Sequence, residues 1–333
     1  MKKLLSILPL ILSGLFLLPH VNAEEIKVGI IGLDTSHALA FTKTMNDAAA
    51  KGNLAKCKVV AVYTKGSPDI ESSLSRVPKY TEQIKEMGVE VVPTIPALLE
   101  KVDAVLLETN DGRPHLEQVI PVLKAGKRVF IDKPIAGSLT DAILIFEASK
   151  LHKLPLFSSS SLRFGPNTLA VRDGSLGKVT HCQTGSPASL EKTHPDLFWY
   201  GIHGVESLFT VLGTGCESVT RSKSDEGMIR VDGKWSGSRT GRFEERKGYG
   251  GTAKGEKGES EVGAYPGYKP LVENIANYFV SGAMPVEAPE TLEIYAFMEA
   301  ADESKRQNGA EVTLESVMKK AQAEAGKRMS EIK

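Results

Sequence analysis

The residues best suited to chemistry are Asp132 and Lys133, which follow a short apolar run and precede Pro134. Residues 129–131 (Val-Phe-Ile) have the composition of a buried strand, and the strand must stop at Pro134 because proline cannot donate to a sheet ladder. In open α/β sheets, ligands bind at the carboxyl ends of the strands. A lysine there can polarise a substrate oxygen, or act as a base if its pKa is lowered. The alternative is an ordinary ion pair with Asp132.

A second reactive group is His203, which lies in a largely apolar segment expected to be helical. An unperturbed histidine titrates near pH ~6.5, so it can accept a proton at neutral pH. The alternative is a hydrogen-bonded histidine on a helix face.

The first strand runs into a turn that resembles a dinucleotide fingerprint only in part. The pattern G-x-G-x-x-G keeps its first glycine, Gly32, but has Asp34 and His37 at the other two positions. Asp34 places a carboxylate where the second glycine lets the backbone approach a pyrophosphate. Thr35 and Ser36 are suited to cap the following helix and to donate hydroxyl groups. The alternative is a plain strand–helix turn with an N-cap.

The end of the second strand bears on the choice of cofactor. A dinucleotide fold that prefers NAD usually places an acid there to hold the ribose hydroxyls. Here the strand ends in Tyr63, followed by Thr64 and Lys65. Lys65 could face a 2′-phosphate, which favours NADP over NAD; the alternative is a solvated loop lysine.

Alternating strands and helices organise the first half of the chain. Strands are expected at residues 26–31, 59–63, 89–92, 103–107, 129–131 and 155–158, with helices between them. This alternation predicts a parallel, doubly wound sheet of the Rossmann type over residues 24–160. Residues 161–333 mix helices with short runs of antiparallel character and predict an α+β domain. Residues 248–260, rich in glycine and charge, are expected to form a mobile loop.

Composition excludes several function classes. The chain has 333 residues, which suits two domains, and 41% apolar and 25% charged residues, which is typical of a soluble globular protein. Its 41 basic residues balance 41 acidic ones. With this balance, the chain lacks the net positive charge typical of proteins that bind nucleic acid or an anionic membrane.

Residues 1–23 have the pattern of a secretory signal peptide. Lys2 and Lys3 form a basic start, residues 4–18 are nearly all apolar, and residues 21–23 (Val-Asn-Ala) form a small-residue cleavage site. The alternative, a retained membrane anchor, would need a longer apolar run of about 20 residues. We therefore expect a mature protein that is exported, periplasmic or secreted, and not bound to a membrane.

Three cysteines remain, Cys57, Cys182 and Cys216, and their spacing fits no metal motif. We expect no metal and three small packed residues. A bridge between Cys182 and Cys216 is the alternative in an exported protein.

Five motifs together resemble the Gfo/Idh/MocA oxidoreductases, the family of glucose–fructose oxidoreductase and inositol dehydrogenase. They are V-G-I-I-G, D-A-V-L-L-E-T-N followed by His115, A-G-K-R-V-F-I-D-K-P, S-L-R-F-G-P and G-I-H-G-V-E. The resemblance implies a Rossmann domain followed by a domain with an open, mainly antiparallel sheet. It also implies NAD or NADP as cofactor, and hydride transfer to or from a carbinol carbon of a sugar, cyclitol or related polyol.

The resemblance implies roles for individual residues. Lys133 and His203 are expected to be catalytic. The substrate is expected to contact Arg163, Tyr200 and His203. The residues expected on the cofactor side are Gly32, Asp34, Thr35, Ser36, His37, Thr64, Lys65, Thr109, Asn110, His115, Asp132 and Lys133.

The chain departs from the family pattern on the substrate side as well. The family places an aspartate four residues before the histidine, and here that position is Trp199. Asp196 lies one helical turn too far away to replace it directly, and Glu206 matches a later acid of the motif.

Two classes of function therefore stay open. One is an exported NAD(P)-dependent oxidoreductase, or a related NAD-using enzyme that processes glycosides. The other is a redox-silent sugar-binding protein that keeps the fold. The retained Lys133 and His203 favour the first, and Asp34 and Trp199 favour the second. A homo-oligomer is compatible with either.

Overall fold

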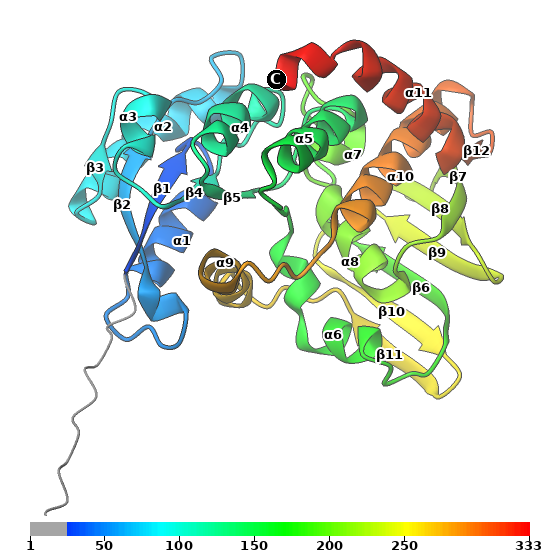
Figure 1. Cartoon of the computed structure of the whole chain (residues 1–333). Coiled ribbons are helices and arrows are strands. Elements are labelled where there is room, and N and C mark those ends of the chain that lie inside the picture. The colour runs from blue at the N-terminus through cyan, green and yellow to red at the C-terminus, as the bar shows by residue number, and fades with distance from the viewer. Residues whose placement is uncertain (1–24) are drawn as a thin grey trace, which may run out of the picture.

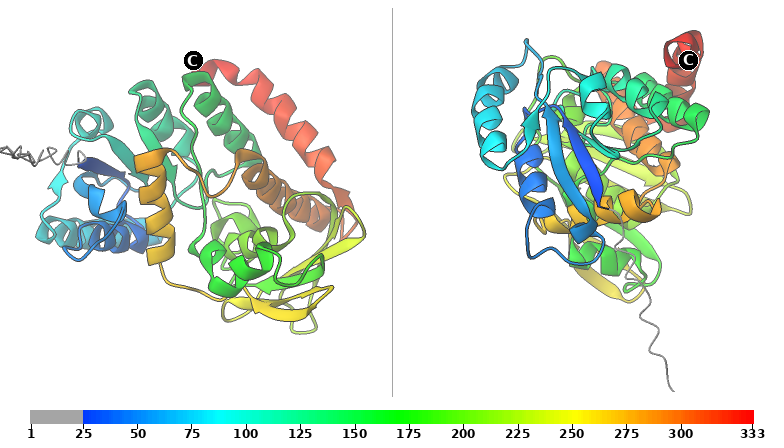
Figure 2. Two further views of the ribbon diagram at one scale, coloured as in Figure 1. Left: turned by 60° about the horizontal axis from the view of Figure 1, so that its bottom comes forward. Right: turned by 60° about the vertical axis from the view of Figure 1, so that its left-hand side comes forward.

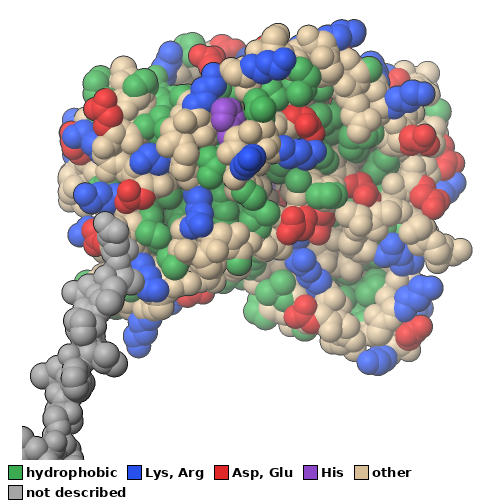
Figure 3. All heavy atoms as spheres, viewed as in Figure 1, with side chains coloured by type: hydrophobic (Ala, Val, Ile, Leu, Met, Phe, Trp, Pro, Cys, Tyr) green, Lys and Arg blue, Asp and Glu red, His purple; other side chains and the backbone are tan. Residues whose placement is uncertain are grey.

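The computed structural model describes residues 25–333, and the expected signal peptide at residues 1–23 lies outside this range. Figure 1 shows two sheets side by side, the first formed by the N-terminal part of the chain and the second by the C-terminal part. Acidic and basic side chains are interspersed over the face drawn in Figure 3. Within residues 25–333, no helix has the length and apolar character needed to cross a membrane.

The first sheet is parallel throughout, with strand order β3-β2-β1-β4-β5. Its strands are β1 (Ile26–Ile31), β2 (Cys57–Tyr63), β3 (Glu90–Val91), β4 (Ala104–Leu107) and β5 (Arg128–Ile131). The helices are α1 (Ser36–Met45), α2 (Glu71–Glu86), α3 (Ile95–Leu99), α4 (His115–Lys124) and α5 (Leu139–His152). The central strands are nearly all apolar because helices cover both faces of a parallel sheet. The predicted Rossmann-type fold is confirmed.

The central strands of this sheet end in register. Ile31 pairs with Leu107, and Leu107 pairs with Ile131. The backbone bonds continue one residue further: the Glu108 N–H donates to the Ile31 carbonyl at 2.7 Å, and the Asp132 N–H donates to the Leu107 carbonyl at 2.9 Å. Glu108 and Asp132 therefore stand on neighbouring strands at the carboxyl edge of the sheet.

The predicted strand at residues 155–158 is wrong as a regular strand. Only Phe157 pairs, through a single parallel bridge to Phe130. The chain leaves the sheet directly afterwards, because Ser160 caps a 3₁₀ helix, η2 (Ser161–Phe164), that leads into the second half.

The second sheet has seven strands in the order β11-β10-β6-β9-β8-β7-β12. They are β6 (Val179–Gly185), β7 (Cys216–Lys223), β8 (Ile229–Trp235), β9 (Arg239–Glu244), β10 (Gly250–Gly255), β11 (Gly258–Val262) and β12 (Val312–Thr313). Neighbouring strands are antiparallel except β6 and β9, which are parallel. The prediction of a mainly antiparallel second sheet is confirmed.

The prediction of a mobile loop at residues 248–260 is wrong, because β10 and β11 form a hairpin there. Gly251 and Gly255 allow close packing against neighbouring backbone. A Cβ atom on Gly251 would lie 2.0 Å from the Gln183 carbonyl oxygen of the neighbouring strand β6. Composition alone cannot distinguish these two uses of glycine.

Helices of the second half pack against both sheets. They are α6 (Pro166–Arg172), α7 (Asp196–Trp199), α8 (Ile202–Leu212), α9 (Lys269–Ser281), α10 (Ala288–Arg306) and α11 (Leu314–Lys327), followed by η3 (Met329–Ile332). Helix α9 packs against the first sheet, and α8 and α10 pack against the second. Every residue of α8 is buried. Helix α9 returns to pack beside α1 and the first sheet, as Figure 2 shows. Helices α10 and α11 pack on α5. The three cysteines are buried and unbridged.

A substitution at Gly32 tests the geometry of the first turn. Its φ is +90°, and a Cβ atom would lie 2.4 Å from the Thr109 backbone nitrogen. Gly32→Ala should therefore lower the free energy of unfolding by about 3 kcal/mol or more, from backbone strain plus the clash. Gly52→Ala, at φ +62° with open space around the Cβ, should cost only about 1 kcal/mol. Equal losses in urea unfolding of the two variants would contradict this account of the turn.

Candidate active site between the two sheets

A cavity of about 700 Å³ lies between the carboxyl edge of the first sheet and the start of α8. Residues from both halves of the chain line it. The first half contributes Thr35, Ser36, His37, Glu71, Arg76, Asn110 and Lys133, and the second contributes Trp199, Tyr200, His203, Tyr249, Tyr265 and Tyr268, among others. The cavity thus brings the two predicted catalytic residues, Lys133 and His203, to one place.

Lys133 lines this cavity although its side chain is only 5% exposed. Its ammonium nitrogen lies 5.9 Å from the centre of the Tyr200 ring, within the range of a cation–π contact. Asp132 bonds instead to His37, whose Nδ1 is 2.7 Å from Asp132 Oδ2. Since no ion pair among residues 25–333 includes Lys133, its charge is available to a bound oxygen atom.

His203 is a neutral histidine in this setting. Its pKa is held well below the usual value, first by burial and then by the positive charge of Lys133. Nδ1 lies 2.7 Å from the Ser160 hydroxyl oxygen, and the ring stands edge-on to Tyr200. If Nδ1 donates to that hydroxyl, Nε2 carries the lone pair and can act as a base.

The position four residues before His203, where the family pattern has an aspartate, is occupied by Trp199. Trp199 lines the cavity and packs on the His194 ring. Asp196 points elsewhere, into ion pairs with Arg221 and Lys305. Ser160 is therefore the partner that orients His203. Sequence reasoning missed Ser160, which stands within a run of four serines and carries no local signal.

The side chain of Asp34 is turned away from the cavity. It is fully buried, and its two carboxylate oxygens accept hydrogen bonds from the Asn110 N–H at 2.8 Å and the Ser73 hydroxyl at 2.7 Å. Burial raises its pKa. Asp34 thus stabilises the turn through hydrogen bonds on the side away from the cavity. Thr35 and Ser36, at the N-terminus of α1, line the cavity.

The cofactor side differs from expectation at the end of β2. Thr64 and Lys65 do not line the cavity; Arg76 and Glu71 of α2 do. Arg76 also donates to the Asp34 backbone carbonyl at 3.2 Å. Sequence reasoning missed both α2 residues, because it looked for selectivity only at the strand end.

His115 and Thr109 lie beneath the cavity rather than in it. The ring nitrogens of His115 lie 2.8 Å from the Thr109 carbonyl oxygen and 3.1 Å from that of Ile135, and burial lowers the pKa of His115. The Thr109 hydroxyl donates to Gln118 at 2.9 Å. These contacts hold the loops after β4 and β5 together.

Arg163, expected to contact the substrate, is fully buried and does not line the cavity. Its guanidinium pairs with Glu206 at 2.9 Å and with Glu290 at 2.6 Å. Glu206 also accepts from the Ser159 hydroxyl at 2.6 Å. These bonds anchor the start of α8, and with it His203, to η2 and α10.

The match to a known protein family covers the first half of the chain. Residues 26–159 match the Gfo/Idh/MocA family model, described as an oxidoreductase family with an NAD-binding Rossmann fold. An uncharacterized oxidoreductase of Streptococcus pneumoniae is 26% identical over 180 residues, 48% of each chain. Myo-inositol 2-dehydrogenase of Thermotoga maritima is 34% identical over 110 residues, 31% of this chain and 33% of that one. The matches therefore span about half, or less, of these curated relatives.

Solved structures share the fold of nearly the whole chain. A probable dehydrogenase from Thermotoga maritima aligns with a TM-score of 0.71 at 19% identity, over 88% of this chain and 100% of that one. Myo-inositol dehydrogenase from Lactobacillus casei, in complex with NAD(H) and myo-inositol, aligns with a TM-score of 0.67 at 17% identity, over 87% and 96%. At these identities the likeness shows the two-domain fold.

The buried ion pairs of Arg163 give a stability prediction. Arg163→Gln leaves Glu206 and Glu290 without their cation, which should lower the free energy of unfolding by about 3–5 kcal/mol. Arg172→Gln, at an exposed position of α6, should change it by less than about 0.5 kcal/mol. Urea unfolding measures both. An unchanged stability of Arg163→Gln, together with lost ligand binding, would instead make Arg163 a substrate residue.

Proposed function

We propose that this chain, whose first half carries the NAD-binding Rossmann fold of the Gfo/Idh/MocA oxidoreductases, is an NAD(P)-dependent oxidoreductase. It would move a hydride to or from a carbinol carbon of a sugar, cyclitol or related polyol. The observation that carries the proposal is the meeting of Lys133 and His203, one from each half, in a single cavity at the carboxyl edge of the parallel sheet.

The residues around the first turn fit a dinucleotide. Gly32 keeps the tight turn, with its φ of +90°. Thr35, Ser36 and Asn110 offer polar groups to the cavity at the N-terminus of α1, where a phosphate is favoured by the helix dipole. Asp34 does not oppose an anion from within the cavity, since it is buried behind the turn. When bound, the nicotinamide supplies the hydride chemistry.

The chain's own residues would then manage the oxygen and the proton. Lys133 would donate a hydrogen bond to the substrate oxygen and stabilise the negative charge that develops on it. His203, neutral because of burial and the charge of Lys133, would hold or take the proton at Nε2. Ser160 would hold the ring in place through Nδ1.

Four neighbouring tyrosines in the cavity lining favour a sugar or polyol as substrate. The Tyr200 and Tyr249 hydroxyls are 3.0 Å apart, the Tyr249 and Tyr265 ring centres 5.9 Å apart, and those of Tyr265 and Tyr268 5.6 Å apart. All four tyrosines line the cavity. Such rings pair an apolar face with a polar hydroxyl, which suits molecules that alternate C–H and O–H groups.

One observation favours the alternative, a redox-silent sugar-binding protein. His37 occupies the third glycine position of the fingerprint, where its imidazole ring lines the cavity and bonds to Asp132. A bulky ring at this position reduces the space next to the turn. The two functions differ in one property, because only the oxidoreductase converts its ligand.

We also propose that the mature chain is exported, on the evidence of residues 1–23. Fractionation of expressing cells should recover the processed chain outside the cytoplasm. Recovery of an unprocessed chain in the cytoplasm would contradict this proposal.

Lys133 gives the first test of the mechanism. Sugars and cyclitols are screened with NAD⁺ and NADP⁺, and the nicotinamide absorbance follows turnover. Lys133→Met should lower kcat by roughly 100-fold or more, because a preorganised donor to the developing charge is lost. Lys79→Met, at an exposed position of α2, should leave turnover unchanged. Turnover by Lys133→Met at the native rate would remove Lys133 from the mechanism.

The pH profile gives the second test. His203 must be neutral to accept a proton, so the rate of alcohol oxidation should rise with pH through the pKa of His203 and then level off. Because burial lowers that pKa well below its usual value, the rate should already be on its plateau at neutral pH. His203→Gln should be slow and should lose this acid limb. An acid limb that persists in His203→Gln would assign the base to another residue.

A further inference from the structure

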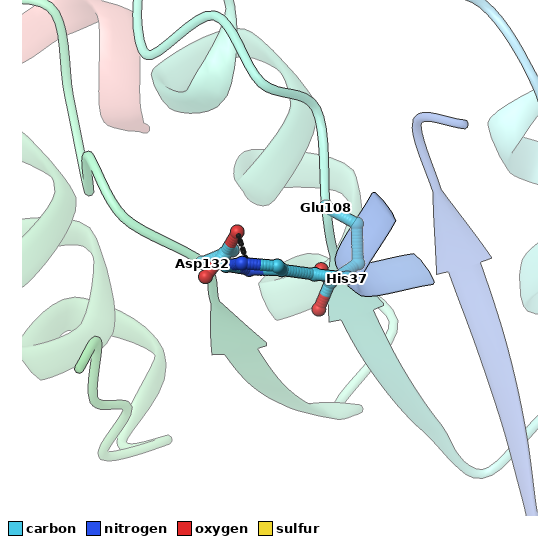
Figure 4. Close-up of side chains that lie close together, drawn as sticks. All are labelled: His37, Glu108 and Asp132. Carbon is cyan, nitrogen blue, oxygen red and sulfur yellow. Dashed lines mark hydrogen bonds and ion pairs between the residues drawn. The ribbon is translucent and has the colours of Figure 1, made fainter. Parts of the chain in front are cut away.

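Three side chains meet beneath the cavity where β1, β4 and β5 end. Glu108 directly follows β4, Asp132 directly follows β5, and His37 stands in the first turn of α1. Figure 4 shows the His37 ring reaching from α1 to Asp132, with the Glu108 carboxylate beside it. Candidate ligand atoms from the three residues all lie within 4.8 Å of one another.

The carboxylates of this cluster lack the partners that burial demands. Glu108 is 0% exposed and Asp132 is 1% exposed. Among residues 25–333, both oxygens of Glu108 and Oδ1 of Asp132 have no hydrogen-bond partner. Only Asp132 Oδ2 is paired, with His37 Nδ1 at 2.7 Å. Each unpaired buried charge costs several kcal/mol, so two neighbouring carboxylates here need a cation or a proton.

Neighbouring residues do not meet this need. In the described part of the chain, no ion pair joins Lys133 to either carboxylate. Without a cation, the Glu108 carboxyl group would therefore have no partner among residues 25–333.

We propose that His37, Glu108 and Asp132 bind a divalent transition-metal ion, with zinc or manganese as the class that fits best. One imidazole and two carboxylates form a mixed nitrogen and oxygen set, which these ions accept, whereas magnesium and calcium prefer oxygen alone. The ion would satisfy the unpaired oxygens and offset both negative charges. His37 lines the cavity, so the ion has a route of entry.

The spacing of these residues in sequence gives no sign of a metal site, because each belongs to a different loop. Only the common register of the strands brings them together. The site is independent of the proposed oxidoreductase function, since it requires neither dinucleotide nor substrate. Failure of one proposal therefore leaves the other standing.

The test uses the mature chain, stripped of metal with a chelator and free of dinucleotide. Calorimetric titration with Zn²⁺ alone should give one ion per chain, and the ion should raise the melting temperature. Glu108→Gln should weaken binding by roughly 100-fold or more, since even indirect ligand partners are worth 10–100-fold. His181→Gln is the control for incidental binding by a histidine, on strand β6, and should bind like the native chain.

Glu108→Gln also separates the ion from a proton, because glutamine has the shape of a protonated glutamate. If Glu108 only holds a proton, the native chain will bind no ion and the variant will melt at the same temperature; that result overturns the proposal. Equal Zn²⁺ binding by the native chain and Glu108→Gln overturns it as well. If Glu108→Gln does not fold, His37→Gln gives the same comparison from a residue at the cavity surface.

Discussion

The common register of β1, β4 and β5 is the constraint on which this site depends. Backbone hydrogen bonds align the last residues of these strands, so the next residues must stand together at one edge. That alignment sets Glu108 beside Asp132 and aims Lys133 toward the second half of the chain. Gly32 permits it, because Thr109 leaves no room for a Cβ atom there. The proposed site therefore lies where parallel sheets generally bind ligands.

The second half contributes His203, the proposed base, whose protonation is governed by its surroundings. Helix α8 is buried along its whole length and is fixed through Glu206 to Arg163, so His203 is held rigidly. Burial and the nearby charge of Lys133 keep its imidazole neutral. A fixed cation beside a neutral imidazole is a suitable pair for polarising a hydroxyl and taking its proton. The rigid packing of α8 thus supports the proposed chemistry by fixing the position of His203.

Much of this could be predicted from local sequence. Alternating strands and helices predict the parallel sheet of the first half, and short strand-like runs predict the antiparallel sheet of the second. Pro134 predicts the strand end beside Lys133. What could not be predicted depends on contacts between distant segments. Asp34 accepts from the Ser73 hydroxyl and the Asn110 N–H, His203 bonds to Ser160, and Glu108 has no hydrogen-bond partner among residues 25–333. The resemblance predicts Arg163 at the substrate, but its burial depends on Glu206 and Glu290, which lie far away in the sequence. The hairpin at residues 250–262 was hidden by glycines that serve packing.

The central claim is that a nicotinamide dinucleotide binds at this carboxyl edge although two of the three fingerprint glycines are replaced. Titration of the mature chain with NADH and with NADPH, followed by nicotinamide fluorescence and by the mass of the complex, tests it most directly. The account predicts that one of the two binds at submillimolar concentration with one molecule per chain. Absence of binding by either at millimolar concentration would contradict it and leave a sugar-binding protein without redox activity.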